Sequence, residues 1–163
     1  MSQIPSAAFQ SRLAPLPLAT YQAGETVFAA GSKTGLLLIL KKGTVAIIKE
    51  AVEIAKVMEP GAVFGEMSAL LDQPHTAEVR ALEASEFHVA DAAMVMQDQI
   101  FLLYIATVLA RRLDVANQTL TKLKSQLQEG HPPDVVGNTI EAIEGLLSAS
   151  GAASTMSAWS PSN

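Results

Sequence analysis

Residues 64–79, FGEMSALLDQPHTAEV, decide the fold. Gly65 permits a tight backbone after a short strand at Val63–Phe64, and Glu66–Leu71 can form about one and a half helical turns. The N–H groups at the start of a helix, with a glycine before them, form a natural cradle for an anion. The stretch therefore favours an anion pocket, although an ordinary turn between a strand and a helix also explains it.

His75 stands where such a pocket needs its positive charge. A histidine is largely neutral near pH 7 unless a nearby anion raises its pKa, and it gives a ligand at most one donor. In the strand that follows, alternation places Val79 and Ala81 on the same inward face as His75. Arg80 therefore points outward and does not replace the missing charge, whereas Thr76 still offers a hydroxyl where the strand begins.

Composition restricts the class of protein. The chain has 163 residues, enough for one domain with a core and a tail, and 49% of them are hydrophobic and 17% charged. The net charge of −5 argues against nucleic-acid binding, and the lack of cysteine excludes disulfides, thiol catalysis and cysteine-ligated zinc. The longest apolar run, residues 100–110, is too short to cross a membrane, so we expect no membrane contact, no signal peptide and a cytoplasmic location.

Short apolar runs separated by glycines fill residues 16–90. Four of these runs are predicted strands: Leu36–Leu40, Val45–Ile48, Val52–Met58 and Val79–Val89. Regular short strands with glycine turns are typical of a barrel or a sandwich-like roll. Before the roll we expect a lead-in over residues 1–15, with one helical turn around Ala7–Leu13.

The pattern changes at Asp91, a good helix N-cap, and glycine and proline are then absent until Gly130. Within a helical region of residues 91–129 we expect a short helix and then a long one. Apolar residues spaced alternately three and four apart form a heptad stripe along it: Ala106, Leu109, Leu113, Ala116, Leu120, Leu123 and Leu127. The stripe either packs on its own domain or joins two subunits in a parallel helix pair.

Residues 130–163 are expected to hold one short helix, starting near Asn138, and a disordered tail rich in serine and alanine. This is too little chain for a winged DNA reader, and no basic recognition helix is found, so we expect no direct nucleic-acid binding. The histidines at 75, 88 and 131 lack the spacing of metal ligands, and no catalytic constellation is found. We therefore expect neither an enzyme nor a metal or cofactor.

Residues 21–90 resemble the cyclic nucleotide-binding domain family. The resemblance rests on YQAGETVFAAGS at 21–32, LLLILKKGTVAI at 36–47, PGAVFGEMSALL at 60–71 and PHTAEVRA at 74–81. It covers about residues 16–128, because LARRLDV at 109–115 is similar to the dimer helix of activator-type (Crp/Fnr-like) members. The family implies an α+β fold: an antiparallel β-roll (a double-stranded β-helix of jelly-roll type) with a phosphate-cassette helix and a long C-terminal dimerisation helix.

The resemblance also implies a ligand, cAMP or cGMP. Gly65 and the amides of Glu66 and Met67 would meet the cyclic phosphate. Glu66 would accept a hydrogen bond from the ribose 2′-hydroxyl, and Ile47 would line the sugar and base pocket. The predicted ligand-binding residues are Ile47, Phe64, Gly65, Glu66, Met67, Ser68, His75, Thr76, Ala77, Arg112 and Asn117.

Two positions depart from the family pattern. Arg112 and Asn117 fall where activator-type members reach the base, but Ala116 replaces a hydroxyl residue there. After the cassette the family has Pro-Arg-x-Ala, whereas residues 74–77 read PHTA. An arginine fork matches two phosphate oxygens. Its loss costs about 1.5–3 kcal/mol, roughly ten- to a hundredfold in affinity.

Three functions stay open at this point. The first is a stand-alone sensor domain that binds a cyclic nucleotide weakly or in a pH-dependent manner and signals through a helical homodimer or an unknown protein partner. The second is a degenerate, ligand-free domain that serves as a dimerisation or protein-interaction module, grouped by similarity with the Crp/Fnr-like transcription regulators. The third is a domain for a different anionic ligand.

Overall fold

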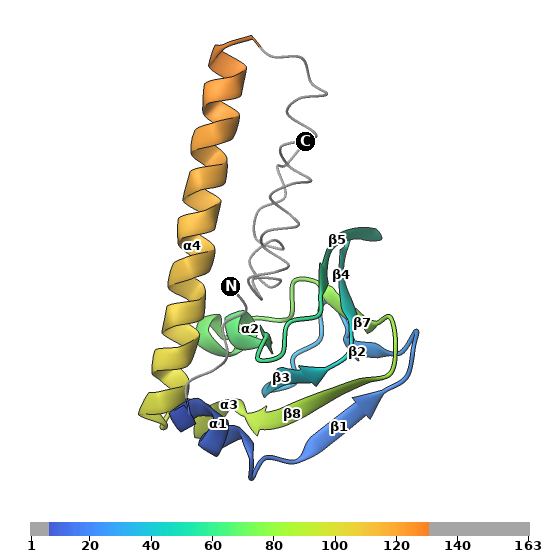
Figure 1. Cartoon of the computed structure of the whole chain (residues 1–163). Coiled ribbons are helices and arrows are strands. Elements are labelled where there is room, and N and C mark those ends of the chain that lie inside the picture. Colours follow the sequence, from blue (N-terminus) through green and yellow to red (C-terminus); the bar gives the residue numbers. More distant parts are fainter. Residues whose placement is uncertain (1–6, 131–163) are drawn as a thin grey trace.

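Two four-stranded antiparallel sheets form the body of the protein in the computed structural model, which describes residues 7–130 (Figure 1). In the first sheet the strand order is β1 (Leu18–Tyr21), β8 (Ser85–Asp91), β3 (Leu36–Lys42) and β6 (Val63–Phe64). In the second it is β2 (Thr26–Phe28), β7 (Glu78–Ala81), β4 (Val45–Lys49) and β5 (Val52–Val57). The predicted antiparallel roll is therefore confirmed at the level of two packed sheets.

Within residues 7–130, four helices accompany the sheets: α1 (Ala7–Leu13), α2 (Glu66–Leu71), α3 (Ala92–Val95) and α4 (Gln99–Gln128). Figure 1 shows α4 standing along one side of the roll and continuing past it, with α1 and α3 beside its first turns and α2 beside it further along. Over residues 7–130, none of the helices has both the length and the apolar character that crossing a membrane requires.

Strand β3 separates two apolar cores. Leu38 and Leu40 point into the space between the two sheets, where they pack with residues such as Phe64 and Phe87. Leu37 and Ile39 point the other way, into a second cluster that contains Phe9, Leu13, Phe101 and Ile105. A strand buried on both faces needs an uninterrupted apolar run, which explains the sequence LLLIL.

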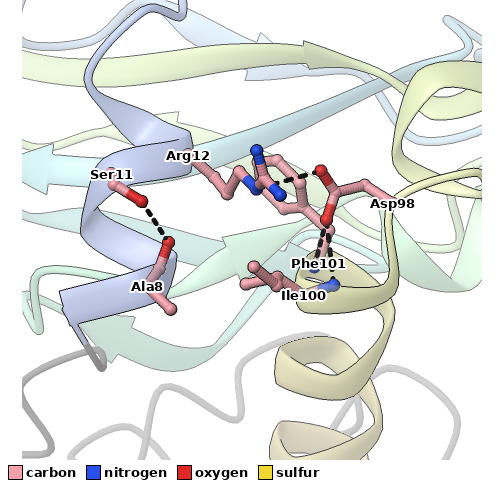
Figure 2. A network of polar contacts seen from close by, with 6 residues as sticks. All are labelled: Ala8, Ser11, Arg12, Asp98, Ile100 and Phe101. Atoms are coloured by element: carbon pink, nitrogen blue, oxygen red, sulfur yellow. Dashed lines mark hydrogen bonds and ion pairs between the residues drawn. The ribbon is translucent and has the colours of Figure 1, made fainter.

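The start of α4 is held by α1 (Figure 2). Asp98 caps α4 by accepting hydrogen bonds from the backbone N–H groups of Ile100 and Phe101, at 2.9 and 3.2 Å. Its other carboxylate oxygen lies 3.2 Å from Nε of Arg12 on α1. The ring of Phe9 stacks on Tyr104, and the Tyr104 hydroxyl donates to the carbonyl of Gly61, at 2.8 Å. The N-terminal helix therefore fixes where the long helix leaves the roll.

Most of the predicted elements are present, with one correction. The short helix Ala7–Leu13, the cassette helix and the two C-terminal helices are confirmed, and Asp91 caps α3 as expected. The single strand predicted over Val79–Val89 is wrong, because β7 and β8 belong to different sheets. The chain turns between them, where the N–H of Leu82 donates to the carbonyl of Thr44 at 2.9 Å. The expected helix near Asn138 and the tail lie outside the described residues.

Candidate functional site

A pocket opens where the cassette helix α2 and the loop after it meet the second sheet. It is lined by Phe28, Ile47, Phe64, Gly65, Met67, Ser68, Gln73, Pro74, His75, Thr76, Ala77 and Val79. Eight of the predicted ligand-binding residues are in this set. The other three, Glu66, Arg112 and Asn117, are not, and Asn117 is exposed on α4.

The sequence reasoning missed four of the lining residues. Val79 was recognised as inward-facing but was not assigned to the ligand. Gln73 and Pro74 belong to the loop after α2, and of these two only Pro74 was noted, as part of the family pattern at residues 74–77. Phe28 comes from β2, far away in the sequence, and only the pairing of β2 with β7 brings it to the pocket. A long-range pairing of this kind leaves no local signal in a single sequence.

Gly65 shapes the backbone that enters the cassette helix. Its φ angle is 89°, in the left-handed region, and it occupies the N-cap position of α2. A Cβ at this position would lie 2.6 Å from the carbonyl oxygen of Leu36, which is backbone and has little freedom to move. The glycine predicted from the sequence is therefore required both by its φ angle and by the close approach of β3.

His75 is buried in the wall of the pocket. Its ring stacks on Phe28 with centroids 4.1 Å apart, and Nε2 lies 3.1 Å from Oγ1 of Thr34. Its backbone is also held, because its N–H donates to Ser32 at 2.8 Å and its carbonyl accepts from Gly31 at 2.7 Å. Burial lowers the pKa of His75, and the negative charge of Glu66 opposes this only in part. The imidazole is therefore neutral near pH 7.

The strand after His75 has the predicted alternation. Val79 and Ala81 are buried, whereas Arg80 is exposed. The Arg80 guanidinium pairs with Glu78, with 2.7 Å between Nη2 and Oε1. The prediction that Arg80 does not face the pocket is therefore confirmed, and Thr76 lines the pocket as expected.

The first turn of α2 is joined to α4 by a buried ion pair. Arg112 donates through Nη1 to the Glu66 carboxylate, and each side chain is only 1% exposed. Nη2 of Arg112 also donates to the carbonyl of Val63, at 3.3 Å. The roles predicted for these two residues, at the sugar and at the base, stay predictions. The structure brings the two residues together, a pairing that the sequence analysis did not anticipate.

An exposed ion pair lies at the other end of α2. Asp72 ends the helix with a φ angle of 51°, and its carboxylate lies 2.5 Å from Nζ of Lys33. The Lys33 ammonium lowers the pKa of the Asp72 carboxyl. Inside the turn, the Ser68 hydroxyl donates to the carbonyl of Gln73, at 2.5 Å. The loop that carries His75 is thus attached to α2 on one side and to the segment of residues 31–34 on the other.

Comparison with known families matches residues 18–97 to the model described as the cyclic nucleotide-binding domain. Residues 18–97 belong to this family. The match spans the roll, the cassette helix and α3, so the cyclic nucleotide-binding domain contains every residue that lines the pocket. Among curated proteins, no sequence matches the chain.

Solved structures share this fold. The catabolite activator protein of Thermus thermophilus has a TM-score of 0.61 at 21% identity, over 90% of this chain and 84% of that one. A protein of a cyclic-GMP-dependent signalling pathway that regulates bacterial phytopathogenesis has a TM-score of 0.57 at 19% identity, over 67% and 94%. The PKAR domain CBD2, bound to Sp-2Cl-cAMPS, has a TM-score of 0.53 at 21% identity, over 74% and 76%. At these identities the likeness shows the fold alone.

Cyclic nucleotide-binding domains are regulatory rather than catalytic. Across residues 7–130, no group of three or more His, Asp or Glu side chains is arranged to hold a metal ion. The pocket presents a ligand with one short helix start, a few hydroxyl and amide groups, and apolar walls.

Proposed function

We propose that the chain is a sensor domain that binds cAMP or cGMP in the pocket beside α2 and transmits binding to α4. The observation that carries this proposal is the buried pair of Glu66 and Arg112, which joins the cassette helix directly to the long helix. Breaking a buried ion pair is costly because it leaves a desolvated charge without its counterpart. A ligand that moves the start of α2, or that competes for Glu66, must therefore also act on α4.

The proposed binding is weak near neutral pH and tighter in acid. In the unliganded pocket the His75 imidazole is neutral near pH 7, because burial lowers its pKa. A bound phosphodiester carries a negative charge and raises that pKa, so binding takes up a proton. The affinity therefore rises as the pH falls through the pKa of the bound state, and it levels off below the pKa of the free state.

Calorimetry with cAMP and with cGMP at pH 6 and pH 8 tests this proposal, with 5′-AMP as a control for the cyclic phosphate. We expect binding of at least one cyclic nucleotide at pH 6, weaker binding at pH 8, and less binding of 5′-AMP. A folded protein that binds neither cyclic nucleotide at either pH would overturn the proposal. Equal affinities at the two pH values would overturn the part assigned to His75.

We also propose that a second copy of the chain covers the heptad stripe of α4, so that the output passes through a dimer. Leu113, Leu120 and Leu127 on this stripe are 62%, 46% and 67% exposed. The side chains that pack on the roll, Phe101 and Ile105 among them, lie nearer the start of the helix. In this dimer α4 is the dimerisation helix. We also propose that the roll is of the jelly-roll type that the family resemblance implies.

Sedimentation tests the dimer. The double substitution Leu113→Glu/Leu120→Glu places charges in the proposed seam and should yield a monomer, because like charges in a paired-helix seam prevent close packing. Gln118→Glu/Thr121→Glu is the matched control on exposed positions outside the stripe. If the leucine variant sediments like the unmodified protein, the helix pairing is refuted.

A second candidate function is a ligand-free interaction module. The observation that favours it is that Glu66, the predicted acceptor for the sugar, is already paired with Arg112. In this case the domain would form the same dimer and would contact a protein partner without a nucleotide. The calorimetry described above separates the two functions.

A further inference from the structure

The pocket needs a positive charge that its own walls do not supply. Of the described residues that line it, none is a lysine, arginine, aspartate or glutamate. His75 is the titratable member of the set, and its imidazole is neutral near pH 7. An anion in a pocket without a cation nearby gains hydrogen bonds but no ion pair in exchange for its lost hydration. If a cyclic phosphate binds here near neutral pH, another side chain must bring the charge.

Lys33 lies in the loop that holds the pocket rim. The segment of residues 31–34 contacts His75 three times, through Gly31, Ser32 and the hydroxyl of Thr34. Next to these contacts, Nζ of Lys33 lies 2.5 Å from the Asp72 carboxylate and 3.4 Å from the Asp72 carbonyl oxygen. Lys33 therefore reaches the same loop, residues 72–77, that provides five of the lining residues.

The ion pair of Lys33 with Asp72 is easily exchanged. The lysine side chain is 52% exposed and the aspartate side chain 89% exposed. Exposed ion pairs contribute little to stability, because water screens both charges in either arrangement. A lysine side chain is also a flexible stem with a compact charge, and it can change partner without moving the backbone.

Among the described residues, two other cations adjoin the segments that line the pocket, and both are already paired. Arg80 is on the outward face of β7 and pairs with Glu78. Arg112 is buried with Glu66, and moving it would break the contact between α2 and α4. Lys33 has neither restriction, since its partner is a solvated carboxylate at the end of α2.

We propose that Lys33 leaves Asp72 and pairs with the phosphate of the bound cyclic nucleotide, and so supplies the charge that His75 lacks. This inference rests on the proposed function and identifies a residue that determines affinity. In the unliganded chain Asp72 holds the lysine at the rim, and it competes with the ligand for the same ammonium group. Removing the lysine and removing the aspartate should therefore have opposite effects on binding.

Four single variants test this inference by calorimetry with cAMP and cGMP at pH 7. Lys33→Gln should weaken binding about tenfold, because a charge-assisted hydrogen bond to the ligand is lost. Asp72→Asn should bind more tightly than the unmodified protein, because the carboxylate no longer competes with the ligand for Lys33. Lys56→Gln and Glu53→Gln are the matched controls, because they disrupt a comparably exposed ion pair, on β5, with 3.6 Å between Nζ and Oε1. These controls should bind unchanged.

The outcomes are distinguishable. If Lys33→Gln and Asp72→Asn weaken binding equally, the ion pair of Lys33 with Asp72 only stabilises the loop of residues 72–77. This inference is then overturned. If Lys33→Gln binds like the unmodified protein, it is overturned as well, while the proposed function stands. If the unmodified protein binds neither nucleotide at any pH, the proposed function fails and this inference fails with it.

A second background adds an independent check. In a His75→Arg protein the pocket has its own permanent cation, so the further loss of Lys33 should matter less. We expect Lys33→Gln to lower the affinity less in that background than in the unmodified one. An equal loss in both backgrounds would place Lys33 outside the phosphate site.

Discussion

Each end of the cassette helix α2 carries an ion pair between a carboxylate and a basic side chain, but one pair is buried and the other is exposed. At its start, Glu66 and Arg112 are each 1% exposed and join α2 to α4. At its end, Asp72 and Lys33 are 89% and 52% exposed and join α2 to the loop of residues 31–34. A buried pair resists separation, whereas a solvated pair exchanges partners readily. The same helix therefore has one end suited to transmitting a change and one end suited to receiving a ligand.

The largest expected effect is at the buried end. Arg112→Met leaves the Glu66 carboxylate buried without its cation and should lower the free energy of unfolding by about 3–5 kcal/mol. Urea denaturation followed by circular dichroism measures this loss. The double variant Glu66→Gln/Arg112→Met should recover much of the stability, because no charge is then left buried. A loss in the double variant as large as in Arg112→Met would mean that packing of the arginine, rather than its charge, holds the two helices together.

The second largest effect concerns affinity rather than stability. His75→Arg introduces the arginine of the family pattern, which is a permanent cation and a bidentate hydrogen-bond donor. Cyclic nucleotide binding at pH 8 should therefore tighten by roughly ten- to a hundredfold. His75→Gln is the matched control, since it keeps a donor of similar size without the charge, and it should not tighten binding. An arginine variant that folds normally and binds no better would mean that the amides at the start of α2 do not face the ligand.

A smaller effect is expected in the stability of the unliganded protein as a function of pH. The pKa of His75 is lowered from its ordinary value of 6.5 in the folded protein. As the pH falls, the unfolded chain therefore binds this proton at a higher pH than the folded chain does. The histidine's contribution to stability is therefore present above pH 6.5 and is lost as the pH falls from 6.5 toward the lower pKa of the folded state. His88 also has a lowered pKa, chiefly through burial, and acts in the same direction.

Urea midpoints of the unmodified protein and of His75→Gln, measured between pH 5.5 and pH 8, check this expectation. The unmodified protein should lose more stability toward acid than the variant, in which His88 is the histidine with a lowered pKa that remains within residues 7–130. Parallel curves for the two proteins would show that His75 is not shielded from water as its contacts indicate.

The smallest effect is expected at the exposed end of α2. Lys33→Gln and Asp72→Asn should leave the midpoint of thermal unfolding essentially unchanged, because both side chains are well solvated. A marked loss of stability in either variant would remove the contrast between the two ends of α2 and would make the exposed pair a structural contact.

Local patterns in the sequence were sufficient to predict many of the helices and strands. Gly65 and the six residues after it predicted the turn and the cassette helix, and the alternation from His75 to Ala81 predicted which side chains face inward. These features depend on backbone conformation and on periodicities of two or 3.6 residues, which a short stretch contains in full. The turn between β7 and β8 has neither glycine nor proline, and it was missed for that reason.

Contacts between distant segments could not be predicted in the same way. Glu66 was assigned to the ligand and Arg112 to the base, and only the position of α4 against α2 shows that they meet. The stacking of Phe28 on His75 and the pairing of Lys33 with Asp72 also join segments about forty residues apart or more. Such contacts depend on how the elements pack, so the geometry of the site follows from the structure and not from its motif.

Proton uptake on binding tests most directly whether the pocket recognises a cyclic phosphate through His75. It is measured by calorimetry of cAMP or cGMP at pH 6 and pH 8, in two buffers that differ in their heat of ionisation. We expect net uptake of up to about one proton at pH 6, little or none at pH 8, and none at either pH in the His75→Arg variant. Binding without proton uptake at pH 6, or the same uptake in the arginine variant, would contradict this role of His75.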